Sequence, residues 1–296
     1  MASLARIEHD GARRDEGLAR RYRADVHGLT TFRALASVEY DRSLSTLIES
    51  EIIPRLMIAH AVDTPEVTTL RIDTDEVTAL APLALEVEAD ALLAHIEGVL
   101  ARGVTVDTVM VDLLAPTARL LGEYWEDDRC NFVDVTMGLW RLQEVVHEIA
   151  ARMPADRMLA VGGHRALFAS MPGDQHNFGT VVIDEMFRRD GWVTDRMSGA
   201  QTPDLIRRVG DDWFDLVGLT VSCDCHIATL TSVVAALRNV SRNPRVCIMV
   251  GGRIFSDDPD LAIQVGADGT AKDARLALRA AADLVRAREG EPLVGS

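Results

Sequence analysis

The feature that most constrains the fold is an alternation of short apolar runs with helical stretches, which begins after residue 153. Each run has the length of a buried strand, and each intervening stretch is long enough for a helix. Because the strand–helix unit repeats about every 25–30 residues, we expect a parallel, doubly wound sheet of the flavodoxin-like (Rossmann-type) kind, with helices on both faces. The expected strands begin at Arg165, Gly191, Phe214 and Arg245, with a brief fifth strand near Ala267.

Residues 34–153 carry a different pattern, in which apolar residues recur at spacings of three and four. This period is typical of amphipathic helices that pack against one another, and we expect a four-helix bundle. Its helices are expected at Leu35 to Ala61, Asp75 to Arg102, from near Thr105, and after Asn131. Residues 1–33 are polar and arginine-rich, so we expect a mobile N-terminal segment there. The predicted division is therefore 1–33, 34–153 and 154–296.

The charge balance limits the classes of partner. The chain has 296 residues, with 31 Lys and Arg against 46 Asp and Glu, and a net charge of −15. This acidity argues against a protein that binds DNA on its own surface. No apolar run reaches the ~18–20 residues of a membrane span, and the first residues do not read as a secretory signal. We expect a cytoplasmic protein whose four cysteines are reduced.

The sharpest motif follows the first expected strand and reads Asp174-Gln175-His176-Asn177-Phe178-Gly179. An Asp two residues before a His is able to accept a hydrogen bond from one ring nitrogen, which leaves the other as a neutral metal ligand. Gly179 permits close backbone approach where the loop becomes a helix. By itself the pattern also fits an ordinary loop with a solvated histidine.

Two further strand ends carry small residues. The third expected strand ends in Thr220-Val221-Ser222, and the fourth ends in Val250-Gly251-Gly252. Hydroxyl groups at one edge position and missing side chains at the next leave room for a large ligand at the carboxyl edge of the sheet. The three elements come in order at three strand ends.

These motifs resemble the cobalamin-binding domain shared by corrinoid methyltransferases, cobalamin-dependent mutases and B12 photoreceptors. The resemblance covers about residues 155–290, although the usual S-x-L motif reads Thr220-Val221-Ser222 here. It implies that His176 is the lower axial ligand of cobalt, in place of dimethylbenzimidazole, with Asp174 as its hydrogen-bond partner. It also implies that the displaced nucleotide tail enters a slot lined by Thr220, Ser222, Gly251 and Gly252.

The helical region contains a second signal, the segment LLGEYWEDDRCNFVDVTMGLWRLQ. Trp125 and Trp140 within it are of the kind that fills a bundle core. The alternative is that Trp125 covers the upper face of a corrin ring, as in the bundles beside other cobalamin domains. Where the light-sensing B12 repressors carry a Glu-His pair after their capping Trp, this sequence has Val135 and Thr136, so their upper His ligand is missing.

A third signal is Cys223-Asp224-Cys225-His226, directly after the third expected strand. A zinc site needs four ligands, and no second Cys or His pair with suitable spacing exists. The segment is expected to shape the corrin edge, and sensing of redox state is the less favoured alternative.

The segment around Trp125 together with VSCDCH resembles the photosynthesis antirepressors of the AerR/PpaA type. That resemblance implies a light-responsive, cobalamin-binding regulator, not an enzyme, that acts on a DNA-binding repressor. It favours the hydroxo or aquo form of cobalamin. The alternatives are a corrinoid methyl carrier for a methyltransferase system and a regulator that senses haem or another tetrapyrrole.

Overall fold

A computed structural model of the chain describes residues 71–154 and 163–290. These residues belong to one compact unit, Thr69–Ser296. The expected N-terminal segment 1–33 and the expected helix from Leu35 to Ala61 lie outside the described residues. None of the described helices is long and apolar enough to cross a membrane.

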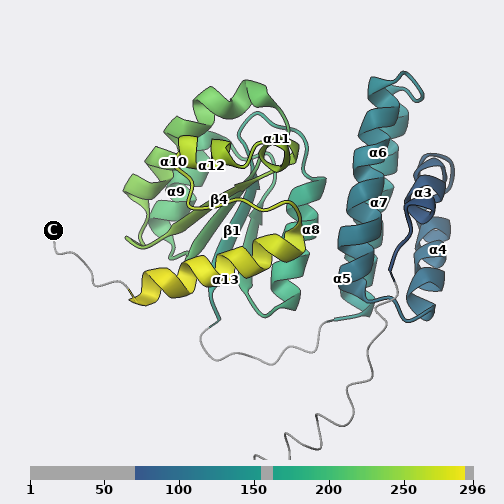
Figure 1. Cartoon of the computed structure of the whole chain (residues 1–296), viewed down its shortest axis with the longest axis horizontal. Helices are drawn as coiled ribbons and strands as arrows, with labels where there is room; N and C mark the ends of the chain where they lie inside the picture. Colours follow the sequence, from purple (N-terminus) through teal and green to yellow (C-terminus); the bar gives the residue numbers. More distant parts are fainter. Residues whose placement is uncertain (1–70, 155–162, 291–296) are drawn as a thin grey trace, which may run out of the picture. The chain divides into compact units, whose positions relative to one another are not determined.

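Four parallel strands form the sheet within the described residues, as the sequence predicts (Figure 1). The strands are β1 Arg165–Ser170, β2 Val193–Met197, β3 Leu216–Thr220 and β4 Cys247–Gly251, in the order β2-β1-β3-β4. The chain moves outward in one direction from β1 to β2 and in the other from β3 to β4. The switch point, where ligands bind in folds of this type, therefore lies between β1 and β3.

The predicted fifth strand near Ala267 is wrong. Only one isolated bridge, between Met249 and Gly269, extends the described sheet beyond β4. The backbone N–H of Asp268 donates to the carbonyl of Ile248 at 2.7 Å, but the Ile248 N–H donates to the Asp268 carboxylate, also at 2.7 Å. A side chain thus occupies a position that a continuing strand would fill with backbone.

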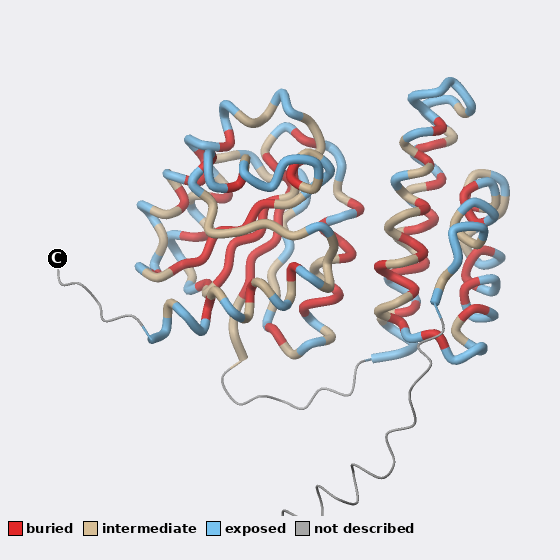
Figure 2. Tube along the Cα trace, in the orientation of Figure 1, coloured by how far each residue is buried: buried red, intermediate tan, exposed pale blue. Residues whose placement is uncertain are grey.

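Helices cover both faces of the sheet, and strands β1, β3 and β4 are buried along most of their length, whereas the edge strand β2 is partly exposed (Figure 2). Alternate strand residues supply two cores, with Ala166 and Phe168 on one face and Leu167 and Ala169 on the other. The first core includes residues of α8 Phe178–Arg189 and α13 Ala274–Gly290, and the second includes residues of α9 Thr202–Asp211 and α10 Ile227–Val240. The short elements η3 Asp224–His226, α11 Arg253–Asp257 and α12 Asp260–Gln264 complete the α/β region.

The residues before the sheet are helical. The helices are α3 Thr74–Glu86, α4 Ala89–Ala101, a continuous run of α5 Val106–Thr108, η2 Val109–Leu114 and α6 Ala115–Glu126, and α7 Phe132–Arg152. The helices predicted near Thr105 and after Asn131 are confirmed. The single helix predicted from Asp75 to Arg102 is wrong, because the chain breaks at Val87 and Glu88 into α3 and α4.

The break follows from a buried cation on α7. The Arg141 guanidinium donates from Nη1 to the carbonyls of Ala84 and Leu85, at 3.0 Å each, in the last turn of α3. Carbonyls at a helix end need partners, and a cation is the favoured one. Arg141 therefore ends α3 four residues beyond Pro82, which the helix tolerates in its interior.

Helix α8 is shared between the two regions. Phe178, Val181, Val182 and Met186 on α8 belong to the same hydrophobic cluster as the core residues of α3 to α7. Phe187 on the other side of α8 packs in the core of the sheet. The helix that carries the sharpest motif at its start is therefore the one that joins the helical region to the sheet.

Candidate functional site

The motif positions meet at the carboxyl edge of the sheet. Ser170 at the end of β1 pairs in register with Thr220 at the end of β3, and Thr220 pairs with Gly251 at the end of β4. Of the predicted positions, Thr220 and Gly251 therefore lie in one row with Ser170, which begins at the switch point between β1 and β3.

A tight turn brings Asp174 back to this row. In the sequence Met171-Pro172-Gly173-Asp174, the Asp174 N–H donates to the Met171 carbonyl at 2.8 Å, and Gly173 has a φ of 90°. Pro followed by Gly with a positive φ is the signature of a type II turn. The Met171 N–H in turn donates to the Thr220 carbonyl at 2.8 Å, which ties the loop to β3.

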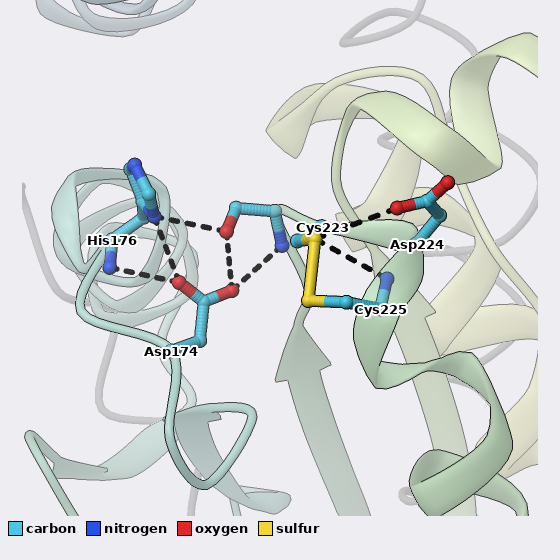
Figure 3. Close-up of a disulfide and its surroundings, with 6 residues drawn as sticks. Asp174, His176, Cys223, Asp224 and Cys225 are labelled. Atoms are coloured by element: carbon cyan, nitrogen blue, oxygen red, sulfur yellow. Dashed lines mark hydrogen bonds and ion pairs between the residues drawn. A yellow bond between two sulfur atoms is a disulfide. The ribbon is translucent and has the colours of Figure 1, made fainter.

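The Asp174 carboxylate organises the loop that follows (Figure 3). Its Oδ1 accepts from both the backbone N–H and the ring Nδ1 of His176, at 2.9 Å each. Its Oδ2 accepts from the Ser222 N–H at 2.7 Å and from the Ser222 hydroxyl at 2.6 Å. The Asp174 side chain is 2% exposed, whereas that of His176 is 71% exposed.

This network fixes the charge of the acid. Burial favours the neutral form of the carboxyl, but hydrogen bonds from the side chains and backbone amides of His176 and Ser222 outweigh burial and hold the pKa of Asp174 well below its usual range. Asp174 is therefore an anion at neutral pH, and an anion only accepts hydrogen bonds.

The same network fixes the tautomer of His176. Because Asp174 only accepts, Nδ1 of the ring carries the proton, and Nε2 is left as the ligand atom of the neutral ring. The hydrogen bond to Asp174 raises the pKa of His176, while burial opposes the rise. The result is an exposed, oriented and electron-rich imidazole nitrogen.

A row of hydroxyl groups runs beneath the loop. Thr180 Oγ1 lies 2.7 Å from Thr220 Oγ1 and 3.2 Å from Ser170 Oγ, and the Ser170 hydroxyl donates to the His176 carbonyl at 2.9 Å. Thr220 was predicted at this edge, but Ser170 and Thr180 were not. Thr180 directly follows Gly179 in the first turn of α8, and that position was the signal available in the sequence.

Ser222 does not belong to this row of hydroxyl groups, although it follows Thr220 closely in the sequence. Its hydroxyl is bonded to Asp174 and lies 2.9 Å from His176 Nδ1. The structure thus brings Ser222 to the histidine, as a second support of the ring.

The predicted glycines differ in what surrounds them. A Cβ on Gly252, whose φ is 125°, would lie 2.0 Å from the Val221 carbonyl oxygen. The backbone itself therefore requires glycine there. A Cβ on Gly251 or Gly179 would meet nothing within 4 Å, so at these two positions the space beside the backbone is open.

Trp125 is not part of the bundle core. It lies in the last turn of α6 and is 48% exposed, and Trp140 on α7 is 49% exposed. The core-filling alternative is therefore wrong for both side chains. Next to Trp125, Glu126 lies 3.9 Å from the Arg253 guanidinium, which directly follows Gly252.

Trp140 lies on α7 one turn before Gln143, a residue that contacts the neighbour of His176. Gln143 Nε2 on α7 donates at 2.8 Å to Oδ1 of Asn177, the residue after His176. Phe132, Thr136 and Trp140 recur at spacings that place them with Gln143 on one side of α7. Phe132 is among the exposed large hydrophobic residues, so this side of α7 is aromatic and open before it reaches Gln143.

The cysteines after β3 depart from the sequence expectation. Cys223 and Cys225 form a disulfide, with a Cα–Cα distance of 5.2 Å, so the prediction that all four cysteines are reduced is wrong for this pair. Cys223 and Cys225 are two positions apart in one turn, which places their sulfur atoms together, and an expectation based on the cellular compartment does not take this proximity into account. Cys130 and Cys247 are free.

The arrangement fits a corrinoid better than a bare metal ion. Among the described residues, no group of three or more His, Cys, Asp or Glu side chains is arranged to hold a metal. A cobalt ion in a corrin ring takes its equatorial nitrogens from the ring and needs one ligand from the protein. His176 provides one oriented donor, and Gly251 and the hydroxyl row leave an open polar edge beside it.

Comparison with known proteins agrees with this geometry. Residues 164–281 match the family model of the B12 binding domain. The monomethylamine corrinoid protein of Methanosarcina barkeri has the same fold, with a TM-score of 0.60 at 15% identity over 72% of this chain and 100% of that one.

One relative matches over much of both chains. It is an uncharacterized 20.5 kDa protein in the bchF–crtJ intergenic region of Rhodobacter capsulatus, 27% identical over 175 residues, which cover 59% of this chain and 91% of the relative. This similarity supports the predicted relationship to the AerR/PpaA type. Residues 164–281 therefore match the B12-binding domain, and much of the chain is similar to an uncharacterized protein from the bchF–crtJ intergenic region.

Proposed function

We propose that this chain is a cobalamin-responsive regulator that relieves repression of photosynthesis genes by acting on a DNA-binding repressor. The observation that carries the cobalamin part is the exposed Nε2 of His176, whose ring is oriented through Nδ1 by the buried Asp174. A regulator of this kind has no catalytic step of its own, and its net charge of −15 suits action through a protein partner rather than on DNA.

Each residue has a distinct role in this proposal. His176 is the lower ligand of cobalt, and Asp174 and Ser222 hold its ring in place. Thr220 and the open space at Gly251 accommodate the nucleotide tail, and Trp125 covers the upper face. Bound cobalamin would supply the light-sensitive chemistry, and the hydroxo or aquo form is the one we expect these residues to hold.

The regulatory part is supported by the relative from the bchF–crtJ intergenic region, a region of photosynthesis genes. A switch requires that two ligand forms differ in affinity for two states of the protein. Trp125 in the last turn of α6 and Trp140 on α7 are suited to discriminate between small and large upper ligands, because their side chains are half-exposed and not buried in the core.

The cobalamin site is tested by titrating purified protein with hydroxocobalamin and following the visible spectrum. His176→Ala is expected to abolish the spectral change that accompanies imidazole coordination and to weaken binding. The control is His95→Ala, since His95 is an exposed residue of α4. Unchanged binding and spectrum in His176→Ala would contradict the ligand assignment.

The regulatory role is tested in the organism. Deletion of the gene is expected to lower photosynthesis transcripts, and complementation with the His176→Ala gene is expected to leave them low. Loss of a DNA-binding repressor is expected to restore them in the deletion strain. Transcript levels that do not respond to the deletion, in light or in darkness, would refute the antirepressor role.

A corrinoid methyl carrier is the second candidate, and the shared fold with the monomethylamine corrinoid protein favours it. A carrier would accept a methyl group on reduced cobalamin and pass it to a methyltransferase partner. Methyl transfer by the reduced holoprotein would support this candidate. Spectra recorded with haem in place of cobalamin test the tetrapyrrole alternative.

A further inference from the structure

The segment after β3 contains a disulfide whose surroundings the cobalamin site does not explain. Cys223 is half-buried and Cys225 is exposed, and Asp224 between them lies in the short helix η3. Their Cα–Cα distance of 5.2 Å is in the range for disulfides. Because Cys225 is exposed, small thiols and disulfides in solution are able to reach the pair.

Contacts at both ends connect this segment to the loop of His176. On one side of Cys223, Ser222 donates its N–H and its hydroxyl to Asp174 Oδ2, at 2.7 and 2.6 Å. On the other side of Cys225, the His226 ring approaches Gly173, with its Cε1 3.6 Å from where a Cβ would stand. The two cysteines therefore lie between two contacts with the loop that carries His176. Figure 3 shows the disulfide beside Asp174 and His176.

One hydrogen bond in the segment depends on the redox state. Cys223 Sγ lies 3.4 Å from Asp224 Oδ1, and a thiol at Cys223 has a proton to donate to this carboxylate whereas a disulfide sulfur has none. The Cys225 N–H donates to Cys223 Sγ at 3.2 Å, and this bond is available in both states. Reduction thus releases the covalent link and adds a partner for Asp224, next to Ser222.

The two other cysteines of the chain are not suited to such chemistry. Cys247 is buried in β4, and burial raises its pKa to about 11. Burial also raises the pKa of Cys130, and the nearby Asp134 adds to the rise. A thiol with a raised pKa has little thiolate to react at neutral pH.

We propose that Cys223 and Cys225 are a redox-active pair, exchanging with a low-molecular-weight thiol–disulfide couple, whose state sets how firmly Ser222 and Asp174 hold His176. The pair itself stands on the geometry of the segment, and the effect on cobalamin affinity rests on the proposed function. The disulfide form is the form in which the His176 network is assembled, so it is the form with the higher affinity.

The exchange balances in electrons and protons. The thiolate of the exposed Cys225 attacks a small disulfide RSSR, which releases one RS⁻ and forms a mixed disulfide. The Cys223 thiolate then attacks the Cys225 sulfur and releases the second RS⁻. The two cysteine protons end on the two leaving thiolates, so one dithiol and one RSSR give one protein disulfide and two RSH.

The first experiment counts thiols. Full-length protein is equilibrated anaerobically in glutathione buffers of graded ratio, trapped with N-ethylmaleimide and analysed by intact mass. We expect two more labelled cysteines at the reducing end than at the oxidising end. Cys223→Ser and Cys225→Ser are expected to lose this response, and Cys130→Ser to keep it. If the label count stays constant over the series, or still changes by two in Cys223→Ser, then Cys223 and Cys225 are not the redox-active pair.

The second experiment measures affinity. Oxidised protein and protein reduced with a water-soluble phosphine are desalted anaerobically, since reductants alter hydroxocobalamin, and then titrated with it. The oxidised form is expected to bind about 5-fold tighter or more, in the range of ordinary coupling energies. The double Cys→Ser variant is expected to bind like the reduced form in both treatments. Equal affinities, or tighter binding by the reduced form, overturn the coupling.

A third measurement separates this inference from the proposed function. If neither form binds hydroxocobalamin, the proposed function fails, but the thiol count still decides the redox pair. The ring signals of His176 in the NMR spectrum of the cobalamin-free protein, at one fixed pH, then decide the coupling. We expect them to shift between the two states, and signals identical in both states overturn the coupling.

Discussion

At the scale of single residues, one buried carboxylate determines what the exposed histidine is able to bind. Asp174 accepts four hydrogen bonds, two from His176 and two from Ser222, and its side chain is almost without contact to solvent. An isolated buried anion would be costly, so these donors are needed to keep it charged. The sequence motif predicts the Asp–His pair, but not that a serine after the next strand completes it.

The first prediction concerns Asp174→Asn. The amide cannot stabilise the imidazolium as a carboxylate does, so the raised pKa of His176 is expected to fall, as NMR titration of the cobalamin-free protein would show. In the wild type, Nε2 is protonated as the pH falls through this raised pKa, so the apparent affinity for cobalamin is expected to begin to fall in that window, because the proton competes with cobalt for Nε2. Asp283→Asn is the control, because Asp283 is an exposed carboxylate of α13 that pairs with Arg286. A His176 pKa that is unchanged in Asp174→Asn would refute the orienting role.

The second prediction uses the two glycines at the end of β4. Gly251→Ala places a methyl group in open space, so stability is expected to change by less than about 1 kcal/mol while cobalamin binding weakens. Gly252→Ala puts its Cβ 2.0 Å from a backbone oxygen at a φ of 125°, and it is expected to lose about 2 kcal/mol or more. Urea denaturation and hydroxocobalamin titration measure both effects. Wild-type binding by Gly251→Ala would show that no ligand occupies that space.

At the scale of elements, a side chain on one helix decides where another helix ends. The period of three and four in the sequence continues from Asp75 to Arg102, and nothing local marks the break at Val87. The break depends on Arg141, which lies more than fifty residues away along the chain and supplies donors to the last turn of α3. The periodicity of apolar residues does not reveal contacts between residues that are far apart in the sequence.

The third prediction follows from that contact. Arg141→Ala leaves the carbonyls of Ala84 and Leu85 without their buried donor, and we expect a loss of about 2–4 kcal/mol in the free energy of unfolding. Chemical denaturation measures it. Arg119→Ala, an exposed arginine of α6, is expected to stay within about 0.5 kcal/mol of the wild type. A similar small loss in Arg141→Ala would show that other groups end α3.

The strands and their end motifs were predictable for a different reason. In a parallel sheet, all the carboxyl ends meet at one edge, so residues that follow different strands in the sequence are neighbours in space. Ser170, Thr220 and Gly251 are in register for that reason. The fifth strand was not predictable, because Asp268 replaces backbone with its side chain, and apolar patterning does not detect such a substitution.

At the scale of the whole described unit, α8 links the histidine to the helical region. The helix begins two residues after His176, packs on the sheet through Phe187 and shares a core with α3 to α7 through Val181 and Val182. A change in the position of the His176 loop therefore reaches the helical region through one rigid element. For the regulator proposed above, this continuity would connect the His176 loop to the helical region.

The last prediction concerns the exposed tryptophans of the helical region, Trp125 on α6 and Trp140 on α7. Trp125→Ala and Trp140→Ala remove half-exposed side chains, so stability is expected to change little, while hydroxocobalamin affinity is expected to fall about 2- to 10-fold for each. Trp140 lies one helical turn from Gln143, which bonds the neighbour of His176, and Trp125 lies next to Glu126, which faces Arg253.

Trp213→Ala is the matched control for these two variants. Trp213 is 46% exposed, close to the exposure of Trp125 and Trp140, but it precedes β3 and so lies at the opposite edge of the sheet from His176. Its replacement is expected to leave cobalamin affinity unchanged. If all three variants bind hydroxocobalamin alike, the aromatic side of α6 and α7 does not cover the ligand. If only Trp125→Ala and Trp140→Ala weaken binding, these two exposed side chains contribute to binding of the ligand and not to the packing of the core.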